Sequence, residues 1–110
     1  MRNGAPRKIV VADDLGIRLE LDALPQRIVS LVPSITETLI ELGAGRRIAG
    51  VTDYCIHPAA AVAGIAKVGG TKGLSMDRIR SLDPDLVIAN KEENRKAEVE
   101  ALQRDYPVFV

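Results

Sequence analysis

The sequence predicts an α/β fold, with a mainly parallel β-sheet flanked by helices. Two observations predict it. Short apolar segments typical of buried strands alternate along the chain with longer segments that have helical periodicity. Several of the apolar segments are also hydrophobic at nearly every position, as expected of parallel strands covered on both faces. Strands alternating with helices imply crossover connections, which place the helices on the faces of the sheet.

Length, composition and charge describe an ordinary globular chain. The sequence has 110 residues, of which 46% are hydrophobic, and 15 basic residues balance 15 acidic ones. A net charge of zero argues against a nucleic-acid partner, which needs a concentrated basic surface. The single cysteine excludes an internal disulfide framework. No signal-peptide pattern is visible after Met1, so a literal reading of the start predicts the cytoplasm.

The first element is an expected β-hairpin. Residues 8–21 are rich in β-formers and alternate around a turn at 13–16, where Asp and Gly tolerate the required backbone geometry. Pro25 separates this segment from the rest of the chain. We therefore divide the chain into an N-terminal hairpin arm, residues 1–25, and an α/β lobe, residues 26–110.

A strand and a helix come directly after the arm. Residues 28–32 form a continuous apolar run that Pro33 ends. Ser34 and Glu37 have the spacing of a capping box, in which each side chain accepts a backbone N–H of the first helical turn. Three apolar residues recur at helical spacing and predict one buried face: Ile35, Leu39 and Leu42.

The middle of the chain is less regular. We expect a strand at 48–52, an irregular stretch at 53–74 with a short strand near Val68, and then another helix. Ser75 is the predicted N-cap of that helix, and Asp77 in its first turn complements the helix dipole.

The last part of the chain repeats the strand-helix-strand pattern. Residues 85–90 form the clearest buried strand, a charged helix is expected at about 92–106, and residues 107–110 form a final strand. Together these elements predict one Rossmann-like lobe preceded by a hairpin.

Candidate ligand contacts lie where the predicted strands end. In open α/β sheets, ligands bind outside the carboxyl ends of the strands. Three segments occupy such ends and would share one edge of a parallel sheet: 33–34, 52–54 and 90–91. For Ser34, helix capping is the simpler interpretation of the side chain itself. The glycine-rich stretch at 68–73 lacks the spacing of a phosphate-binding loop and indicates a close backbone turn, so we reject nucleotide binding.

A cytoplasmic metal-binding or metal-sensing domain that uses Cys55 and His57 is the alternative interpretation. Cys55 and His57 are two residues apart, and thiolate with imidazole can share a transition metal. The chain has no other Cys or His to complete a site, and a lone cysteine is more often a small buried hydrophobic residue. Catalytic triads, suitably spaced acid pairs and cofactor fingerprints are also missing from the sequence, so an enzyme is the least favoured function.

The motifs together resemble a known family. The resemblance extends from about residue 9 to residue 110, and it includes the hairpin arm. It is to the N-terminal lobe of class III substrate-binding proteins of ABC importers, the cobalamin and ferric-siderophore binders also called the helical backbone metal receptor family. The stretches that carry it are, in order, RIVSLVPSITETLIELG, IAGVTDYC, KVGG, MDRIRSLDPDLVIA and YPVFV.

This resemblance implies a role in transport rather than catalysis. A complete member has two α/β lobes joined by a long helix and clamps its ligand between them, so the C-terminal lobe would be a partner lying outside these 110 residues. The implied ligand is a corrinoid or a ferric chelate, without an intrinsic cofactor, and the implied location is the periplasm or cell surface. Asp77 occupies the position that docks to the ABC transporter permease. The implied ligand-binding residues are Pro33, Ser34, Tyr54, Thr71, Lys72, Asn90 and Lys91.

Overall fold

The core of the molecule is a five-stranded sheet. A computed structural model describes residues 9–12, 16, 18–21, 25–70, 73–92 and 94–110. The strand order is β5-β4-β3-β8-β9, and every neighbouring pair is parallel. The predicted α/β fold with a parallel sheet is therefore confirmed. The strands are β3 (Ile28–Ser30), β4 (Ile48–Val51), β5 (Ala66–Lys67), β8 (Leu86–Ile88) and β9 (Val108–Phe109).

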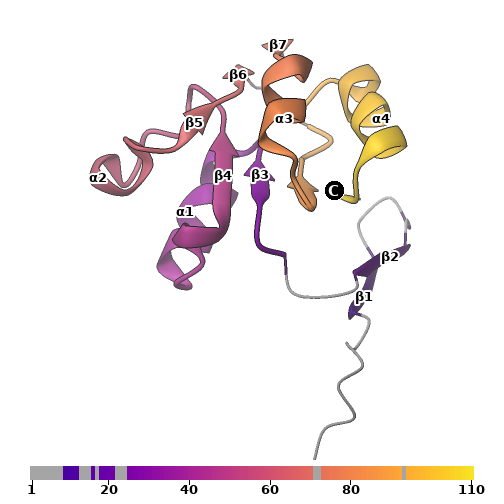
Figure 1. The fold of residues 1–110 in the computed structure, drawn as a ribbon, viewed down its shortest axis with the longest axis horizontal. Helices are drawn as coiled ribbons and strands as arrows, with labels where there is room; N and C mark the ends of the chain where they lie inside the picture. Colours follow the sequence, from indigo (N-terminus) through magenta and orange to yellow (C-terminus); the bar gives the residue numbers. More distant parts are fainter. Residues whose placement is uncertain (1–8, 13–15, 17, 22–24, 71–72, 93) are drawn as a thin grey trace, which may run out of the picture.

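Two antiparallel hairpins accompany the sheet. The predicted N-terminal hairpin is confirmed as β1 (Ile9–Ala12) paired with β2 (Arg18–Leu21), and Figure 1 draws it outside the sheet. The second hairpin, β6 (Gly69–Gly70) with β7 (Gly73–Leu74), lies in the stretch expected to be irregular. Its Leu74 backbone N–H donates to Glu98 Oε2 at 2.9 Å, which ties this hairpin to the last helix.

Helices cover both faces of the sheet (Figure 1). They are α1 (Pro33–Glu41), the 3₁₀ turn η1 (Gly45–Arg47), α2 (Ala59–Val62), α3 (Met76–Leu82) and α4 (Lys96–Asp105). The short α2 was not predicted, and α4 begins four residues later than expected. Among the described residues, every helix is too short or too polar to cross a lipid bilayer.

The hydrophobic core consists of two clusters, one on each face of the sheet. The larger cluster packs α3 and α4 against the central strands through residues that include Val29, Val87, Ile79 and Leu102. The smaller cluster packs α1 against β4. Burying large apolar side chains such as these stabilises a fold by about 1.5–3 kcal/mol each. The members of the smaller cluster are Ile48, Val51 and Cys55, with Leu39, Ile40 and Ile65 partly buried beside them.

The start of α1 differs from the prediction. The N-cap is Val32, in extended backbone, and its side chain makes no capping hydrogen bond, so the predicted capping box of Ser34 and Glu37 is wrong. Pro33 occupies the first helical position, where its fixed φ favours the helix and its missing N–H costs nothing. The helix therefore begins two residues earlier than a Ser34 N-cap implies, and Ser34 lies exposed within the first turn.

The predicted apolar face of α1 is also partly wrong. Leu42 lies at the C-cap and is 77% exposed, while Ile35 and Leu39 are only half-buried. The fully buried residue of this helix is Thr36, a polar side chain. By contrast, the predicted capping of α3 is confirmed, because Ser75 Oγ accepts the Arg78 N–H and Asp77 lies in the first turn.

The central strand pair is held together at its amino end by one carboxylate. Asp85, just before β8, accepts the backbone N–H groups of Gln26 and Arg27 at 2.8 and 2.9 Å. The Arg27 side chain in turn donates through Nε to the carbonyl oxygen of Leu82 at 2.6 Å. Hydrogen bonds to an ionised group are stronger than neutral ones, so this contact sets where β8 begins beside β3.

Candidate functional site at the carboxyl edge of the sheet

The candidate site lies where the chain changes direction across the sheet. From β3 the chain runs through α1 to β4 and β5, and it later returns to the other side of β3 as β8, continuing through α4 to β9. Because α1 and α4 cover opposite faces, the turns after β3 and β8 diverge. Such a switch point at the carboxyl ends of parallel strands is the usual ligand site of an open α/β sheet. We call this edge of the sheet the rim.

The structure brings most of the predicted ligand-binding residues to the rim. Pro33 and Ser34 begin α1 directly beyond β3, Tyr54 follows β4, and Asn90 with Lys91 follows β8. Because the three strands are parallel neighbours, these segments share one edge. Thr71 and Lys72, which were also predicted, lie outside the described residues.

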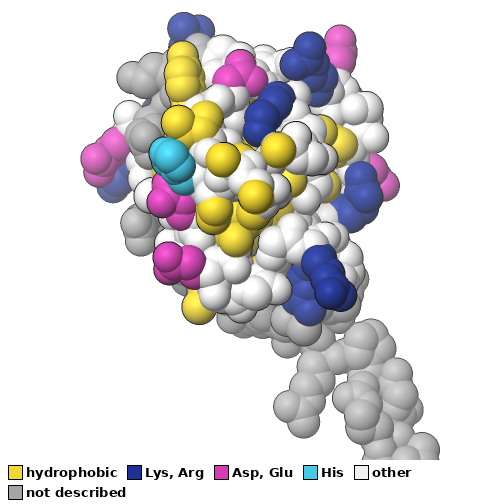
Figure 2. Space-filling view, turned by 90° about the vertical axis from the view of Figure 1, so that its left-hand side faces the viewer, with side chains coloured by type: hydrophobic (Ala, Val, Ile, Leu, Met, Phe, Trp, Pro, Cys, Tyr) yellow, Lys and Arg dark blue, Asp and Glu magenta, His cyan; other side chains and the backbone are white. Residues whose placement is uncertain are grey.

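Tyr54 is the most prominent rim side chain. It is 64% exposed, and a Cβ atom added to Gly70 would lie 3.4 Å from its Cε2, so the ring packs beside the β6–β7 hairpin. Figure 2, which faces the side of the molecule that carries α2, shows hydrophobic side chains gathered in one area. Ile56, which is 57% exposed, and the exposed alanines of α2 follow Tyr54 closely in the chain. An exposed aromatic face of this kind suits a large flat ligand.

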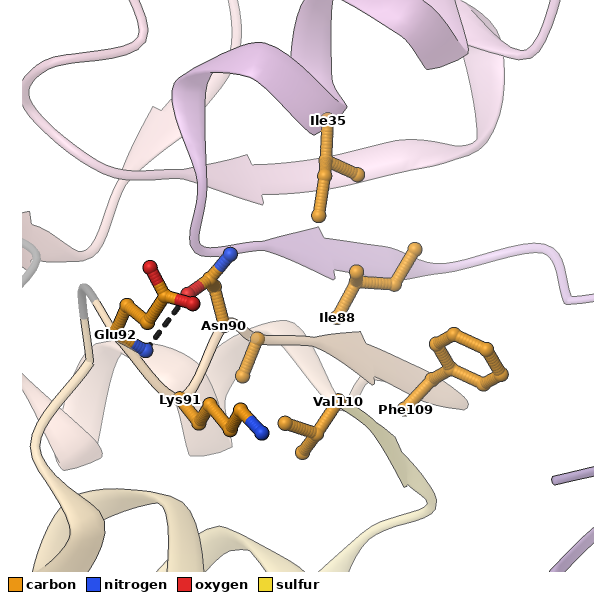
Figure 3. A pocket seen from close by; sticks show the side chains of 8 residues that line it. Ile35, Ile88, Asn90, Lys91, Glu92, Phe109 and Val110 are labelled. Carbon is orange, nitrogen blue, oxygen red and sulfur yellow. Dashed lines mark hydrogen bonds between the residues drawn. The ribbon is translucent and has the colours of Figure 1, made fainter. Parts of the chain in front are cut away.

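The turn after β8 is organised by Asn94, which sequence reasoning missed. Its Oδ1 accepts the Asn90 backbone N–H at 2.7 Å, and its Nδ2 lies 3.4 Å from the carbonyl oxygen of Leu31. Asn90 Oδ1 accepts the Glu92 backbone N–H at 2.7 Å (Figure 3). Asn94 is only 4% exposed and thus bridges the diverging turns at the switch point. In the sequence, Asn94 stands within a run of charged residues that is typical of a solvated helix face, so nothing there indicates a buried side chain.

A pocket of about 360 Å³ opens beside the β8 turn. This volume is at the low end of the range for small-molecule sites, roughly 300–1,000 Å³. Asn90 and Lys91 form its polar side, while Ile35, Ile88 and Phe109 provide apolar walls (Figure 3). Phe109 pairs with Ile88, and Ile88 with Ser30, on the face that α1 covers. The apolar residues were not predicted, because a strand's sequence does not tell which of its faces is left open.

The two residues of the alternative metal site lie in different environments. Cys55 is 1% exposed, and its Sγ lies 3.2 Å from both Thr36 Oγ1 and Thr52 Oγ1. His57 is exposed. Within the described part of the chain, no group of three or more His, Cys, Asp or Glu side chains is arranged to hold a metal ion. Among the described residues, no third side chain of these types therefore joins Cys55 and His57 in a metal site.

Asp77 lies away from these contacts, at the start of α3. Its side chain is 97% exposed and meets Arg80 Nη1 at 3.1 Å, one turn along the helix. An exposed pair of this kind contributes little to stability, about 0–1 kcal/mol. The carboxylate is therefore available to a partner at small cost to the fold.

Comparison with known proteins identifies the family. A family model described as periplasmic binding protein matches residues 28–110. The vitamin B12-binding protein of Pectobacterium carotovorum is 35% identical over 80 residues, which cover 73% of this chain and 29% of that protein. The crystal structure of the periplasmic vitamin B12 binding protein BtuF of Vibrio cholerae is 29% identical with a TM-score of 0.70, and the match covers 77% of this chain and 33% of that one.

A heme-binding structure is equally similar. The periplasmic heme-binding protein RhuT from Roseiflexus sp. RS-1, solved in its apo form, is 29% identical with a TM-score of 0.71, over 76% of this chain and 32% of that one. The chain thus spans about a third of the length of the relatives it matches. The matched region contains the whole five-stranded sheet and the rim. Because the family model matches residues 28–110, which is most of the sequence, the chain belongs to the periplasmic binding protein family.

Proposed function

We propose that this chain contributes the ligand-binding lobe of an ABC-importer substrate-binding protein for a metal chelate, such as a corrinoid or a ferric chelate. The observation that carries the proposal is that Pro33–Ser34, Tyr54 and Asn90–Lys91 lie on one rim at the switch point of a parallel sheet. The similarity to vitamin B12-binding and heme-binding proteins supports the ligand class. The mechanism is enclosure: rim backbone and polar side chains hold the ligand and change no bond in it.

The same proposal assigns residues 26–110 to one lobe of a two-lobed protein, with residues 1–25 as a hairpin arm. The length of the relatives supports this, because the chain covers only 29–33% of the three named above. The apolar walls of the pocket, Ile35, Ile88 and Phe109, support it further, because side chains of this kind are normally packed against other apolar groups. In this proposal the ligand is clamped between the rim and the second lobe.

Removing the Tyr54 ring should weaken chelate binding. The test is to titrate cyanocobalamin and hemin separately into the 110-residue chain. Because one lobe keeps only part of the contact surface, we expect weak but measurable binding, with a Kd of about 1 mM or lower. Tyr54→Ala should raise that Kd by about 5- to 15-fold, the loss of one aromatic contact of about 1–1.5 kcal/mol. Calorimetry and, for hemin, the Soret absorbance measure both values.

Leu42→Ala is the matched control, since Leu42 is 77% exposed and lies at the C-cap of α1, at the opposite end of that helix from the rim. Its Kd should equal that of the unaltered chain. The proposal is wrong if neither cyanocobalamin nor hemin binds, or if Leu42→Ala weakens binding as much as Tyr54→Ala does.

Docking to a permease is the second part of the proposal, and it depends on Asp77. Its full exposure at the start of α3 supports contact with a basic partner. In the complete protein assayed with its permease, Asp77→Ala should reduce ligand uptake about tenfold, equivalent to about 1.4 kcal/mol of docking energy, while the ligand Kd stays unchanged. Asp105→Ala, which removes an exposed carboxylate at the end of α4, is the control and should leave uptake unaltered. Equal uptake by the two variants would refute the role of Asp77.

A further inference from the structure

Four polar side chains are buried together directly beneath the rim. Ser30, Thr36 and Thr52 are 0% exposed, and Cys55 is 1% exposed. They come from three segments: the end of β3, the first turns of α1, and the turn that follows β4. Of the four, only Cys55 was predicted to act with another side chain, as half of the alternative metal site, and the proposed function uses none of these four side chains.

The four side chains form a continuous chain of short contacts. Thr36 Oγ1 donates to Ser30 Oγ at 2.9 Å or to the Val32 carbonyl oxygen at 3.2 Å, and it lies 3.2 Å from Cys55 Sγ. Cys55 Sγ lies 3.2 Å from Thr52 Oγ1 on its other side. The backbone contributes as well, because the Cys55 N–H donates to the Thr52 carbonyl oxygen at 3.1 Å. The thiol is therefore the link between α1 and the turn after β4.

This arrangement constrains the distance between the two segments. Within this cluster, the contact between Thr36 Oγ1 and Cys55 Sγ is the one that joins the two segments, so it forms in one relative placement of α1 and the turn. The other partners lie within each segment: Ser30 Oγ and the Val32 carbonyl oxygen for Thr36, and Thr52 Oγ1 for Cys55. Sulfur accepts and donates weakly but is larger than oxygen, which lets one thiol contact hydroxyls on both of its sides. Cys55 is also a member of the smaller hydrophobic cluster, so its side chain combines apolar packing with the two hydroxyl contacts.

We propose that this hydroxyl–thiol cluster holds the Tyr54 segment in place relative to the Ser34 segment, which makes Thr36 and Cys55 positioning residues for the ligand. Tyr54 is the residue directly before Cys55, and Ser34 is two residues before Thr36. The expected effect of the cluster on ligand binding rests on the proposed function. The expected effect of the cluster on the mobility of Tyr54 does not depend on any ligand.

The first experiment measures that mobility without a ligand. The chain has two tyrosines and no tryptophan, so Tyr106→Phe leaves Tyr54 as the only fluorophore that responds. In this background, Thr36→Val keeps the side-chain shape and removes the hydroxyl. We expect it to lower the fluorescence anisotropy of Tyr54 and to raise the reaction rate of the Cys55 thiol with a disulfide reagent about tenfold, because the turn opens more often.

Two variants complete this experiment. Thr38→Val makes the same change on the same helix at an exposed threonine, whose Oγ1 donates to the Ser34 carbonyl oxygen at 3.0 Å, and it should alter neither readout. Thr36→Ser retains the hydroxyl and should restore both values toward those of the parent. Anisotropy and thiol reactivity that are the same in Thr36→Val, Thr38→Val and the parent would overturn the proposal.

The second experiment is a double-mutant cycle on ligand affinity. We expect Thr36→Val to raise the Kd for hemin or cyanocobalamin about 3- to 10-fold when Tyr54 is present, and to have no effect in the Tyr54→Ala background. Equal losses in both backgrounds would mean that Thr36 acts through general stability, which contradicts the proposal. If the unaltered chain binds neither compound, the proposed function fails, whereas the fluorescence and thiol results still decide whether the cluster positions Tyr54.

Discussion

Replacing Gly69 with alanine should destabilise the protein by roughly 2–5 kcal/mol, the combined cost of a strained backbone and an overpacked site. Gly69 has a φ of +108°, a conformation that side chains with a Cβ rarely adopt. An added Cβ would also lie 2.5 Å from the carbonyl oxygen of Gly73 and 3.2 Å from the backbone nitrogen of Ser75. Both neighbours are backbone atoms, so they cannot move aside as the end of a side chain would.

Gly73→Ala is the matched control in the same hairpin. A Cβ at Gly73 would meet nothing within 4 Å, and its partner in the β6–β7 pair is Gly70. We expect this variant to be neutral or to gain up to about 1 kcal/mol, because alanine narrows the unfolded ensemble. Urea unfolding followed by circular dichroism measures both. A loss below about 1 kcal/mol for Gly69→Ala, or equal losses for the two variants, would contradict the close backbone approach at Gly69.

Asn94→Ala should cost about 2–4 kcal/mol and loosen the turn after β8. The substitution removes the acceptor of the Asn90 backbone N–H and the donor to the Leu31 carbonyl oxygen, and it leaves a space where a 4%-exposed side chain was packed. Buried backbone groups deprived of a partner account for most of the expected cost. Unfolding in urea gives the total, and hydrogen exchange of the Asn90 amide reports on the turn directly.

Arg95→Ala is the control for this change. Arg95 is exposed and is the N-cap of α4, but its side chain makes no capping hydrogen bond. Its loss should change the free energy of unfolding by less than about 0.5 kcal/mol. An Asn90 amide that stays as protected in Asn94→Ala as in Arg95→Ala would show that Asn94 does not organise the turn.

The sheet and the location of the rim could be predicted from the sequence because their signals are local. Continuous apolar runs such as residues 28–32 identify strands buried on both faces, and helices between them require parallel neighbours. Once the strands are parallel, their carboxyl ends must coincide. Pro33, Tyr54 and Asn90 are therefore placed at one edge by strand order alone, without knowledge of any side-chain contact.

The contacts that shape the rim could not be predicted from the sequence, because they join distant residues. Cys55 meets Thr36 across 19 positions, and Asn94 meets Leu31 across 63. Threonine and cysteine carry no pattern that tells a buried hydrogen-bond network from ordinary packing. The prediction of where α1 begins was wrong for a local reason. Proline at the first helical position competed with the Ser34 capping pattern, and the proline determined where the helix begins.

The central strand pair is fastened at both ends by residues far apart in the chain. Asp85 holds Gln26 and Arg27 across 59 and 58 positions at one end, and Asn94 reaches Leu31 at the other. Long loops must close before such contacts form, and this slows assembly. The turns after β3 and β8 therefore reach their native arrangement only once these two strands have paired. A chain in which β3 and β8 have not paired has no switch point, so under the proposed function it would offer a ligand none of the arrangement described here.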